Sequence, residues 1–81
     1  MGKRFVAVRV LADRYQLSQL KIWSLSRVGW AGKRGKLRSV EKKWDKMFGS
    51  CFAEDDLIEW IKDNESEYRE LQQRYLNSVT V

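Results

Sequence analysis

The side chains that could do chemistry in this sequence are mainly cations. There are 16 Lys and Arg residues against 11 Asp and Glu, whereas His is absent and Cys51 is the only cysteine. A metal cluster of Cys and His, or a Cys–His nucleophile pair, needs residues that the sequence lacks, so neither is expected. Residues 32–36 also lack the spacing of a nucleotide-binding loop, G-x-x-x-x-G-K followed by Ser or Thr. We therefore expect a binding protein with no cofactor and no metal, and not an enzyme.

The cations are concentrated in the first part of the chain. Residues 1–47 hold thirteen Lys and Arg against three acids, a net charge of +10. Residues 48–81 hold three Lys and Arg against eight acids, a net charge of −5, and a solvated helix face would explain these carboxylates. A surface charged only for solubility would more naturally mix the two signs. The separation favours a protein that binds a polyanion such as nucleic acid.

The elements that must position these cations begin with two short helices joined by a tight turn, over residues 11–27. Apolar side chains recur at helical spacing on both segments, with one in the turn: Leu11, Ala12, Tyr15, Leu17, Ile22 and Leu25. The small Ala12 lets the second helix cross close to the first, and Ser18 is a good N-cap for the second helix. Gln16 stands where most helix-turn-helix motifs have Gly. The pattern predicts a helix-turn-helix, and an ordinary helical hairpin is the alternative.

Strands are expected on either side of this motif. Residues 5–10 are rich in β-branched side chains and predict a short strand that passes into the first helix near Val8. Between residues 36 and 52 we expect two short strands joined by a turn near Asp45 or Gly49. Such a basic hairpin after a helix-turn-helix is called a wing.

The last segment predicts one long helix. Three acids at 54–56 cluster where a helix N-terminus stabilises negative charge, and neither Gly nor Pro follows them. Apolar residues recur there in a heptad seam with one polar position: Leu57, Ile61, Asn64, Tyr68, Leu71 and Tyr75. The beginning of this helix should close the core. The stripe of Tyr68, Leu71 and Tyr75 would then serve oligomerisation, with packing back on the same domain as the alternative.

The whole chain should form one domain over residues 1–63 with a helical extension over 64–81. Cys51 alone cannot form an intrachain disulfide, and no apolar run approaches the length of a membrane span. The apolar stretch near the N-terminus is too short for a signal peptide. These features predict a cytoplasmic protein.

The order of short strand, helix-turn-helix, basic wing and closing helix resembles the winged-helix domains of phage excisionases, AlpA-type regulators and phage terminase small subunits. The matching residues are Val10-Leu11-Ala12-Asp13-Arg14-Tyr15, Leu17-Ser18, Ile22-Trp23 and Phe52-Ala53-Glu54-Asp55-Asp56-Leu57-Ile58-Glu59-Trp60-Ile61. The match spans residues 5–63, without the Pro-containing turn of many excisionases and with a longer wing. It implies a small α+β fold, a winged helix-turn-helix of the MerR and excisionase kind, with a two-stranded basic wing and a long C-terminal helix.

The resemblance also implies a function. Excisionase domains bind adjacent DNA sites cooperatively, bend DNA and direct an integrase toward excision, and terminase domains mark the packaging site for the motor subunit. We accordingly expect a sequence-specific double-stranded DNA-binding protein of phage or mobile-element type with an architectural role. Excision, packaging and transcription regulation stay open as the process served. An integrase-like or terminase-like partner would bind the C-terminal helix.

The resemblance assigns roles to individual residues. The second helix would enter the major groove with these polar and aromatic side chains: Ser18, Gln19, Lys21, Trp23 and Ser24. Gln19 can bond adenine in two places, Lys21 can read guanine or contact a phosphate, and Arg27 would contact the backbone. Flanking phosphates or a minor groove would be held by the basic residues of the loop and wing: Lys33, Arg34, Lys36 and Arg38. The alternatives are that Trp23 covers the hydrophobic corner and that Trp44 packs the wing on the domain.

Two other classes of function stay open. An RNA-binding or ribosome-associated protein would share the basic charge and would stack single strands on Trp. A phage-encoded inhibitor would hold a host protein through the C-terminal stripe and the acidic face. Preference for duplex over single strands separates the first class from a DNA-binding protein.

Overall fold

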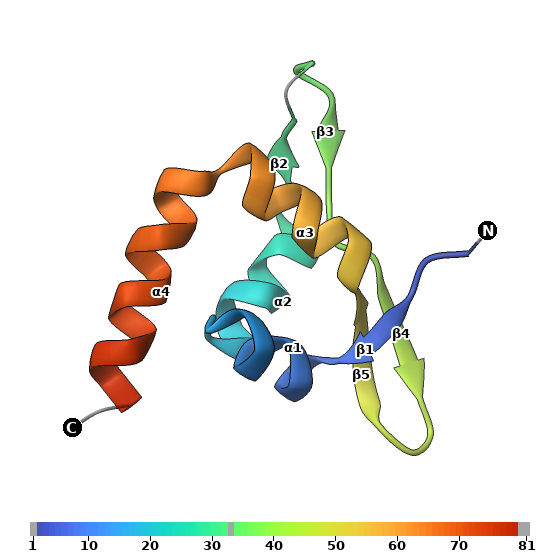
Figure 1. Ribbon diagram of the computed structural model, residues 1–81. Coiled ribbons are helices and arrows are strands. Elements are labelled where there is room, and N and C mark those ends of the chain that lie inside the picture. Colours follow the sequence, from blue (N-terminus) through green and yellow to red (C-terminus); the bar gives the residue numbers. More distant parts are fainter. Residues whose placement is uncertain (1, 33, 80–81) are drawn as a thin grey trace.

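In the computed structural model of the protein, which describes residues 2–32 and 34–79, a short strand and two helices are followed by four short strands and then two more helices. The elements are β1 (Phe5–Ala7), α1 (Val8–Tyr15), α2 (Gln19–Arg27), β2 (Trp30–Ala31), β3 (Leu37–Arg38), β4 (Lys42–Asp45), β5 (Gly49–Ala53), α3 (Glu54–Asp63) and α4 (Glu65–Val79) (Figure 1). The expected α+β class is confirmed, as is the short strand that passes into a helix at Val8.

The predicted pair of helices joined by a tight turn is present as α1 and α2. Gln16 takes the left-handed backbone angle that Gly usually supplies, with φ 57°, and Leu17 is fully buried in the turn. A non-glycine residue pays about 1 kcal/mol for this conformation. The Ser18 hydroxyl accepts a hydrogen bond from the Lys21 amide at 3.1 Å, which confirms the predicted N-cap.

Two antiparallel sheets flank this pair of helices. The first has the strand order β1-β5-β4, and the hairpin of β4 and β5 turns between Asp45 and Gly49, as predicted. The second sheet pairs β2 with β3, which makes a further hairpin that the sequence did not predict; Gly32 and residues 34–36 are the described part of the loop that joins its strands. Gly29 makes this hairpin possible, because its φ is +74° and a Cβ there would overlap the Arg38 carbonyl oxygen.

The prediction of one long C-terminal helix is wrong. The helix breaks at Asn64, whose φ of −132° and ψ of 48° are not helical, and α4 starts at Glu65 in a new direction (Figure 1). The change of direction brings Tyr68 against Trp60, with ring centroids 6.4 Å apart, and lets the Tyr68 hydroxyl donate to the Tyr15 carbonyl at 2.7 Å. A straight helix would leave these apolar surfaces in water, so tertiary packing outweighs helical continuity.

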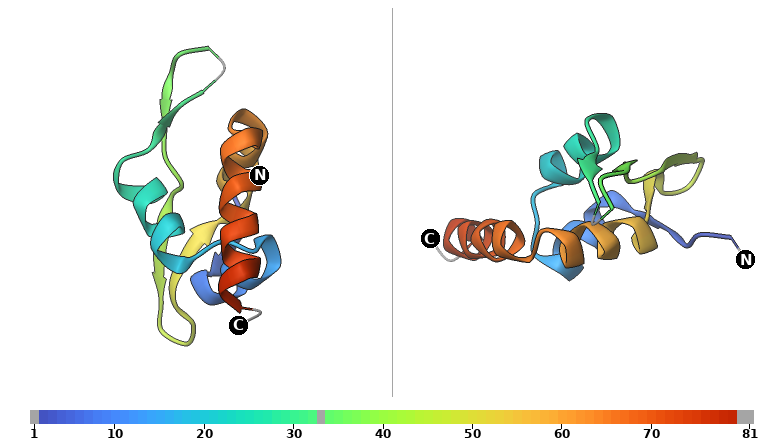
Figure 2. Two further views of the ribbon diagram at one scale, coloured as in Figure 1. Left: turned by 90° about the vertical axis from the view of Figure 1, so that its left-hand side faces the viewer. Right: turned by 90° about the horizontal axis from the view of Figure 1, so that it is seen from above.

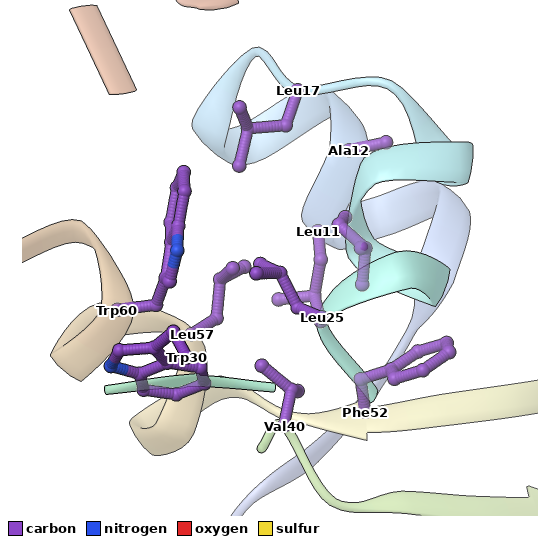
Figure 3. Packing of buried hydrophobic residues seen from close by; sticks show 10 residues of the cluster. Leu11, Ala12, Leu17, Leu25, Trp30, Val40, Phe52, Leu57 and Trp60 are labelled. Carbon is purple, nitrogen blue, oxygen red and sulfur yellow. The ribbon is translucent and has the colours of Figure 1, made fainter. Parts of the chain in front are cut away.

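The hydrophobic core lies where α1, α2 and α3 meet the sheets (Figure 3). Its buried members are Leu11, Ala12, Leu17, Ile22, Leu25, Trp30, Val40, Phe52, Leu57 and Trp60. Tyr68 and Leu71 of α4 pack against this cluster from the same chain. For these two residues of the predicted stripe, packing back on the domain is therefore the observed arrangement.

The elements divide into two sides. α3 and α4 lie along one side, and α2 lies on the other between two hairpins that extend in opposite directions (Figure 2). We call these the α3–α4 side and the α2–hairpin side. Among the described helices, none is long and apolar enough to cross a bilayer.

Candidate nucleic-acid interface

The outward face of α2 is the centre of the candidate interface. Ile22 and Leu25 point into the core, which leaves the opposite side of the helix open. The side chains on that open side line a shallow groove: Leu20, Trp23, Ser24, Arg27 and Val28. We call these five residues the α2 face. Gln19 is exposed at the start of the same helix, next to the N-cap Ser18.

Trp23 connects the α2 face to the first sheet. Its ring meets Phe52 edge-on at 5.2 Å between centroids, and it packs against the core, which was the alternative role predicted for it. The Lys42 ammonium lies 4.5 Å from the ring centroid, and the Arg27 guanidinium carbon lies 5.9 Å from it. These are cation–π distances, so the indole holds two cations at the edge of the α2 face.

Several cations on the α2–hairpin side have no ion pair within the part of the chain that the structure describes. They are Arg27, Arg34, Lys36, Lys42, Lys43 and Lys46. The three on the β4–β5 hairpin, Lys42, Lys43 and Lys46, were not among the contact residues predicted from the sequence. The alternation along β4 could have identified Lys42, because it shares one face of the strand with Trp44.

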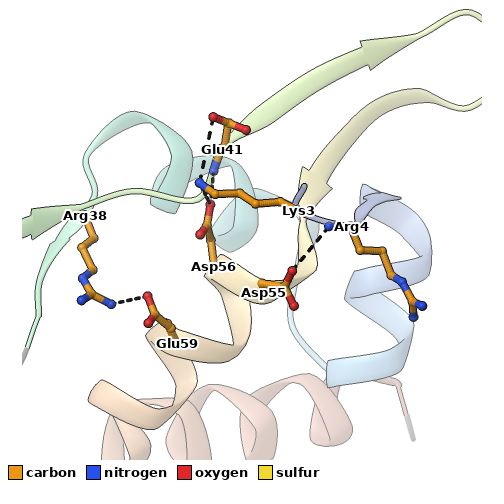
Figure 4. A network of polar contacts seen from close by, with 7 residues as sticks. All are labelled: Lys3, Arg4, Arg38, Glu41, Asp55, Asp56 and Glu59. Carbon is orange, nitrogen blue, oxygen red and sulfur yellow. Dashed lines mark hydrogen bonds and ion pairs between the residues drawn. The ribbon is translucent and has the colours of Figure 1, made fainter. Parts of the chain in front are cut away.

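Two of the predicted contact residues point elsewhere. The Lys21 ammonium lies 2.8 Å from the Glu67 carboxylate of α4 and 5.2 Å from the centre of the Trp60 ring. Arg38 pairs with Glu59 of α3, and this contact raises the pKa of Arg38 (Figure 4). Both cations are therefore turned to the α3–α4 side, and the structure does not bring them to the α2 face.

The remaining predicted residues are placed as follows. The Ser24 hydroxyl donates to the Lys21 carbonyl at 2.7 Å, so its lone pairs stay available on the α2 face. Arg34 and Lys36 are exposed near the tip of the β2–β3 hairpin. Lys33 lies outside the described residues. Trp44 is exposed on β4 and does not pack the hairpin on the domain, contrary to its alternative role.

The first acid of α3 is buried, not solvated. Glu54 as a whole residue is 7% exposed, and its carboxylate accepts hydrogen bonds from the Tyr15 hydroxyl and from the Arg14 guanidinium, both at 2.6 Å. The bond from Tyr15 lowers the pKa of Glu54, and Arg14 lowers it further. Burial, with the bond to Glu54, raises the pKa of Tyr15 to about 12. Glu54 therefore joins the start of α3 to the end of α1.

The next acids hold the ends of other segments (Figure 4). Asp56 accepts a hydrogen bond from the Glu41 amide at 3.0 Å and a second from the Lys3 ammonium at 3.1 Å. The bond between Lys3 and Asp56 raises the pKa of Lys3. Asp55 accepts from the Arg4 amide at 3.4 Å. The acidic run of α3 thus fixes the N-terminal segment and the approach to β4, which is a structural task.

Comparison with known proteins finds no match: no family model fits the sequence, and neither a curated protein nor a solved structure is significantly similar to it. The resemblance to winged-helix domains therefore stays a prediction. The class that the structure defines is a small α+β domain with two antiparallel sheets and, over the described residues, four helices.

Proposed function

We propose that the protein binds double-stranded DNA through the α2 face and the two hairpins that flank it. One observation carries the proposal. Six of the described cations without an ion pair in the first half of the chain lie on the α2–hairpin side, and Arg9 on α1 is the exception, whereas the acids at the start of α3 and Glu67 of α4 are occupied on the α3–α4 side. A basic face backed by an acidic one orients the molecule toward a polyanion.

In this proposal α2 enters the major groove. Gln19 and Ser24 would reach base edges, and Arg27 would contact phosphate. The hairpins extend away from α2 in opposite directions, so Lys36 and Lys46 would contact the backbone on either side (Figure 2). The longest dimension of the molecule is 39 Å, comparable to one turn of B-DNA at about 34 Å. A monomer would therefore cover about one turn, which suits an architectural protein of the excisionase type that binds adjacent sites.

The test is binding to random duplex DNA by fluorescence anisotropy across a salt series, with single-stranded DNA and RNA in parallel. Six phosphate contacts predict a log–log slope of about −5 for the duplex. The double variant Arg27→Gln/Lys46→Gln should reduce the magnitude of this slope by about 2, because two contacts are lost.

The matched control is Lys62→Gln/Arg74→Gln, which removes the same charge from exposed positions on α3 and α4. It should leave the slope unchanged. Equal losses from both double variants would show that net charge alone drives binding. Tighter binding to single-stranded RNA would replace the proposal with the RNA-binding function, and flat, weak binding to every nucleic acid would direct the search to protein partners.

A further inference from the structure

The tip of the β4–β5 hairpin exposes large apolar side chains. Trp44 is 71% exposed, Met47 84% and Phe48 59%, and we call these three residues the hairpin-tip patch. Trp44 lies one residue before the end of β4, and Met47 and Phe48 lie in the turn that follows the strand. Large apolar side chains exposed within five residues of one another at the end of a hairpin indicate a surface that meets a partner.

The turn that carries the patch is held in place by its own hydrogen bonds. The Asp45 carboxylate accepts from the Met47 amide at 2.8 Å and from the Phe48 amide at 3.0 Å. Gly49, at φ +74°, returns the chain to β5 opposite Asp45. The apolar side chains are therefore presented on a preformed support, which lowers the entropic cost of ordering them in a complex.

The charges around the patch favour a polyanion as its partner. Lys42 shares the Trp44 face of β4 and Lys46 lies in the turn, whereas Lys43 lies on the opposite face, 5.5 Å from the centre of the Phe5 ring; none of the three has an ion pair with another described residue. The nearest acid, Asp45, accepts from backbone amides. Lys42 also lies on the Trp23 ring, so the patch continues the α2 face and is not a separate surface.

We propose that the hairpin tip inserts an apolar side chain, Met47 first, into a base step of duplex DNA from the minor groove. The inference rests on the proposed function and adds a mode of contact to it. Apolar wedges on basic proteins partly unstack a base step, and the added contact offsets the cost of unstacking. Because that cost is smaller at a weakly stacked or mismatched step, the preferred ligand is a duplex that contains such a step.

The experiment places 2-aminopurine, which brightens when it loses stacking, at successive positions of a short duplex under saturating protein. The wild-type protein should raise the fluorescence at one position and should bind a duplex with a single mismatch several-fold more tightly than the matched duplex. Met47→Ser and Met47→Ser/Phe48→Ser should abolish both effects and weaken binding about ten-fold, with an unchanged salt slope since no charge is altered. The single variant Met47→Ser should fold normally, because the Met47 side chain is the most exposed of the patch, so a loss of both effects in it is not due to misfolding.

The matched control is Leu37→Ser, which replaces an equally exposed side chain, 84%, within β3 instead of at a turn. It should keep the fluorescence signal. Salt-dependent duplex binding without any change of 2-aminopurine fluorescence would overturn the wedge and leave the proposed function standing. Absence of duplex binding, with tip-dependent binding to vesicles of anionic phospholipid, would overturn both and assign the patch to a membrane surface.

Discussion

The α3–α4 side and the α2–hairpin side use the same kinds of residue in opposite ways. On the α3–α4 side Trp60 is 1% exposed and the acids Glu54, Asp56 and Glu67 each have a cationic partner. On the α2–hairpin side Trp44 is 71% exposed, and the described cations near the two hairpin tips, Arg34, Lys36 and Lys46, form no ion pair with a described acid. Residue type alone therefore does not distinguish a stabilising group from a binding group, whereas burial and pairing do.

The difference between the two sides also concerns the stability of the domain. Unpaired like charges on one face destabilise a small domain through mutual repulsion. The buried aromatic rings and paired acids on the opposite side supply stabilising contacts that offset this repulsion. With this repulsion offset, the cations of the α2–hairpin side can stay without ion pairs and remain available to a polyanion.

The largest expected effect contrasts two tryptophans. Trp60→Ala should lower the free energy of unfolding by about 4 kcal/mol, because it removes a fully buried ring that supports both Leu57 and Tyr68. Trp44→Ala should change it by less than about 0.5 kcal/mol, since the side chain is mostly in solvent. Urea unfolding followed by circular dichroism measures both. Similar losses from the two substitutions would show that the two sides of the molecule do not differ in how they use tryptophan.

A smaller effect is expected at Glu54 and depends on pH. Its pKa is lower in the folded protein than the ordinary value of 4.5, so its stabilisation is complete above that value and is lost as the pH falls through the folded pKa. Glu54→Ala should cost about 2 kcal/mol at neutral pH, from the loss of hydrogen bonds to a charged acceptor. Glu54→Gln keeps an acceptor for Tyr15 and should flatten the acid limb of the stability curve.

The control for the Glu54 substitutions is Tyr15→Phe, which removes the hydroxyl that donates to the Glu54 carboxylate and keeps the ring. Because the pKa of Tyr15 is raised to about 12 in the folded protein, the contribution of this hydroxyl is present below pH 10 and is lost as the pH rises through 12. Thermal melts across both pH ranges check the two limbs. An acid limb as steep in Glu54→Gln as in the wild type would mean that other carboxylates govern acid unfolding.

The smallest effect concerns DNA affinity and contrasts two cations of α2. Lys21→Gln should weaken duplex binding less than two-fold, because the ammonium is engaged by Glu67 and turned from the α2 face. Arg27→Gln should weaken it several-fold, since it removes a free phosphate contact. Anisotropy titrations at one salt concentration compare them. A greater loss from Lys21→Gln would mean that α4 moves and releases this lysine when DNA binds.

Elements whose causes are local were predictable. The Ser18 cap, the buried Leu17 of the turn and the hairpin between Asp45 and Gly49 follow from spacing and side-chain chemistry within a few residues. The β2–β3 hairpin escaped prediction because its strands have two residues each and depend on the close approach of Gly29 to Arg38.

The candidate site was only partly predictable for a related reason. Periodicity distinguishes the core-facing from the outward side of α2, and it assigns Arg27 and Ser24 to the outward side. It cannot reveal that Lys21 has an acid beside it, because Glu67 lies 46 residues away in the sequence. Sequence periodicity likewise cannot place the cations of the β4–β5 hairpin beside α2. Only the tertiary structure shows that Lys42 lies over the Trp23 ring.

By itself the sequence determined the α+β class, the helix–turn–helix order and the division of charge between the two halves of the chain. The tertiary structure alone decided where the C-terminal helix breaks and which charges are neutralised. At Asn64 the local preference for continuing the helix is worth less than the burial of Tyr68 and Leu71 against the core. Ion pairing is decided in the same way, because the attraction between two charges depends on their distance in space and not along the chain.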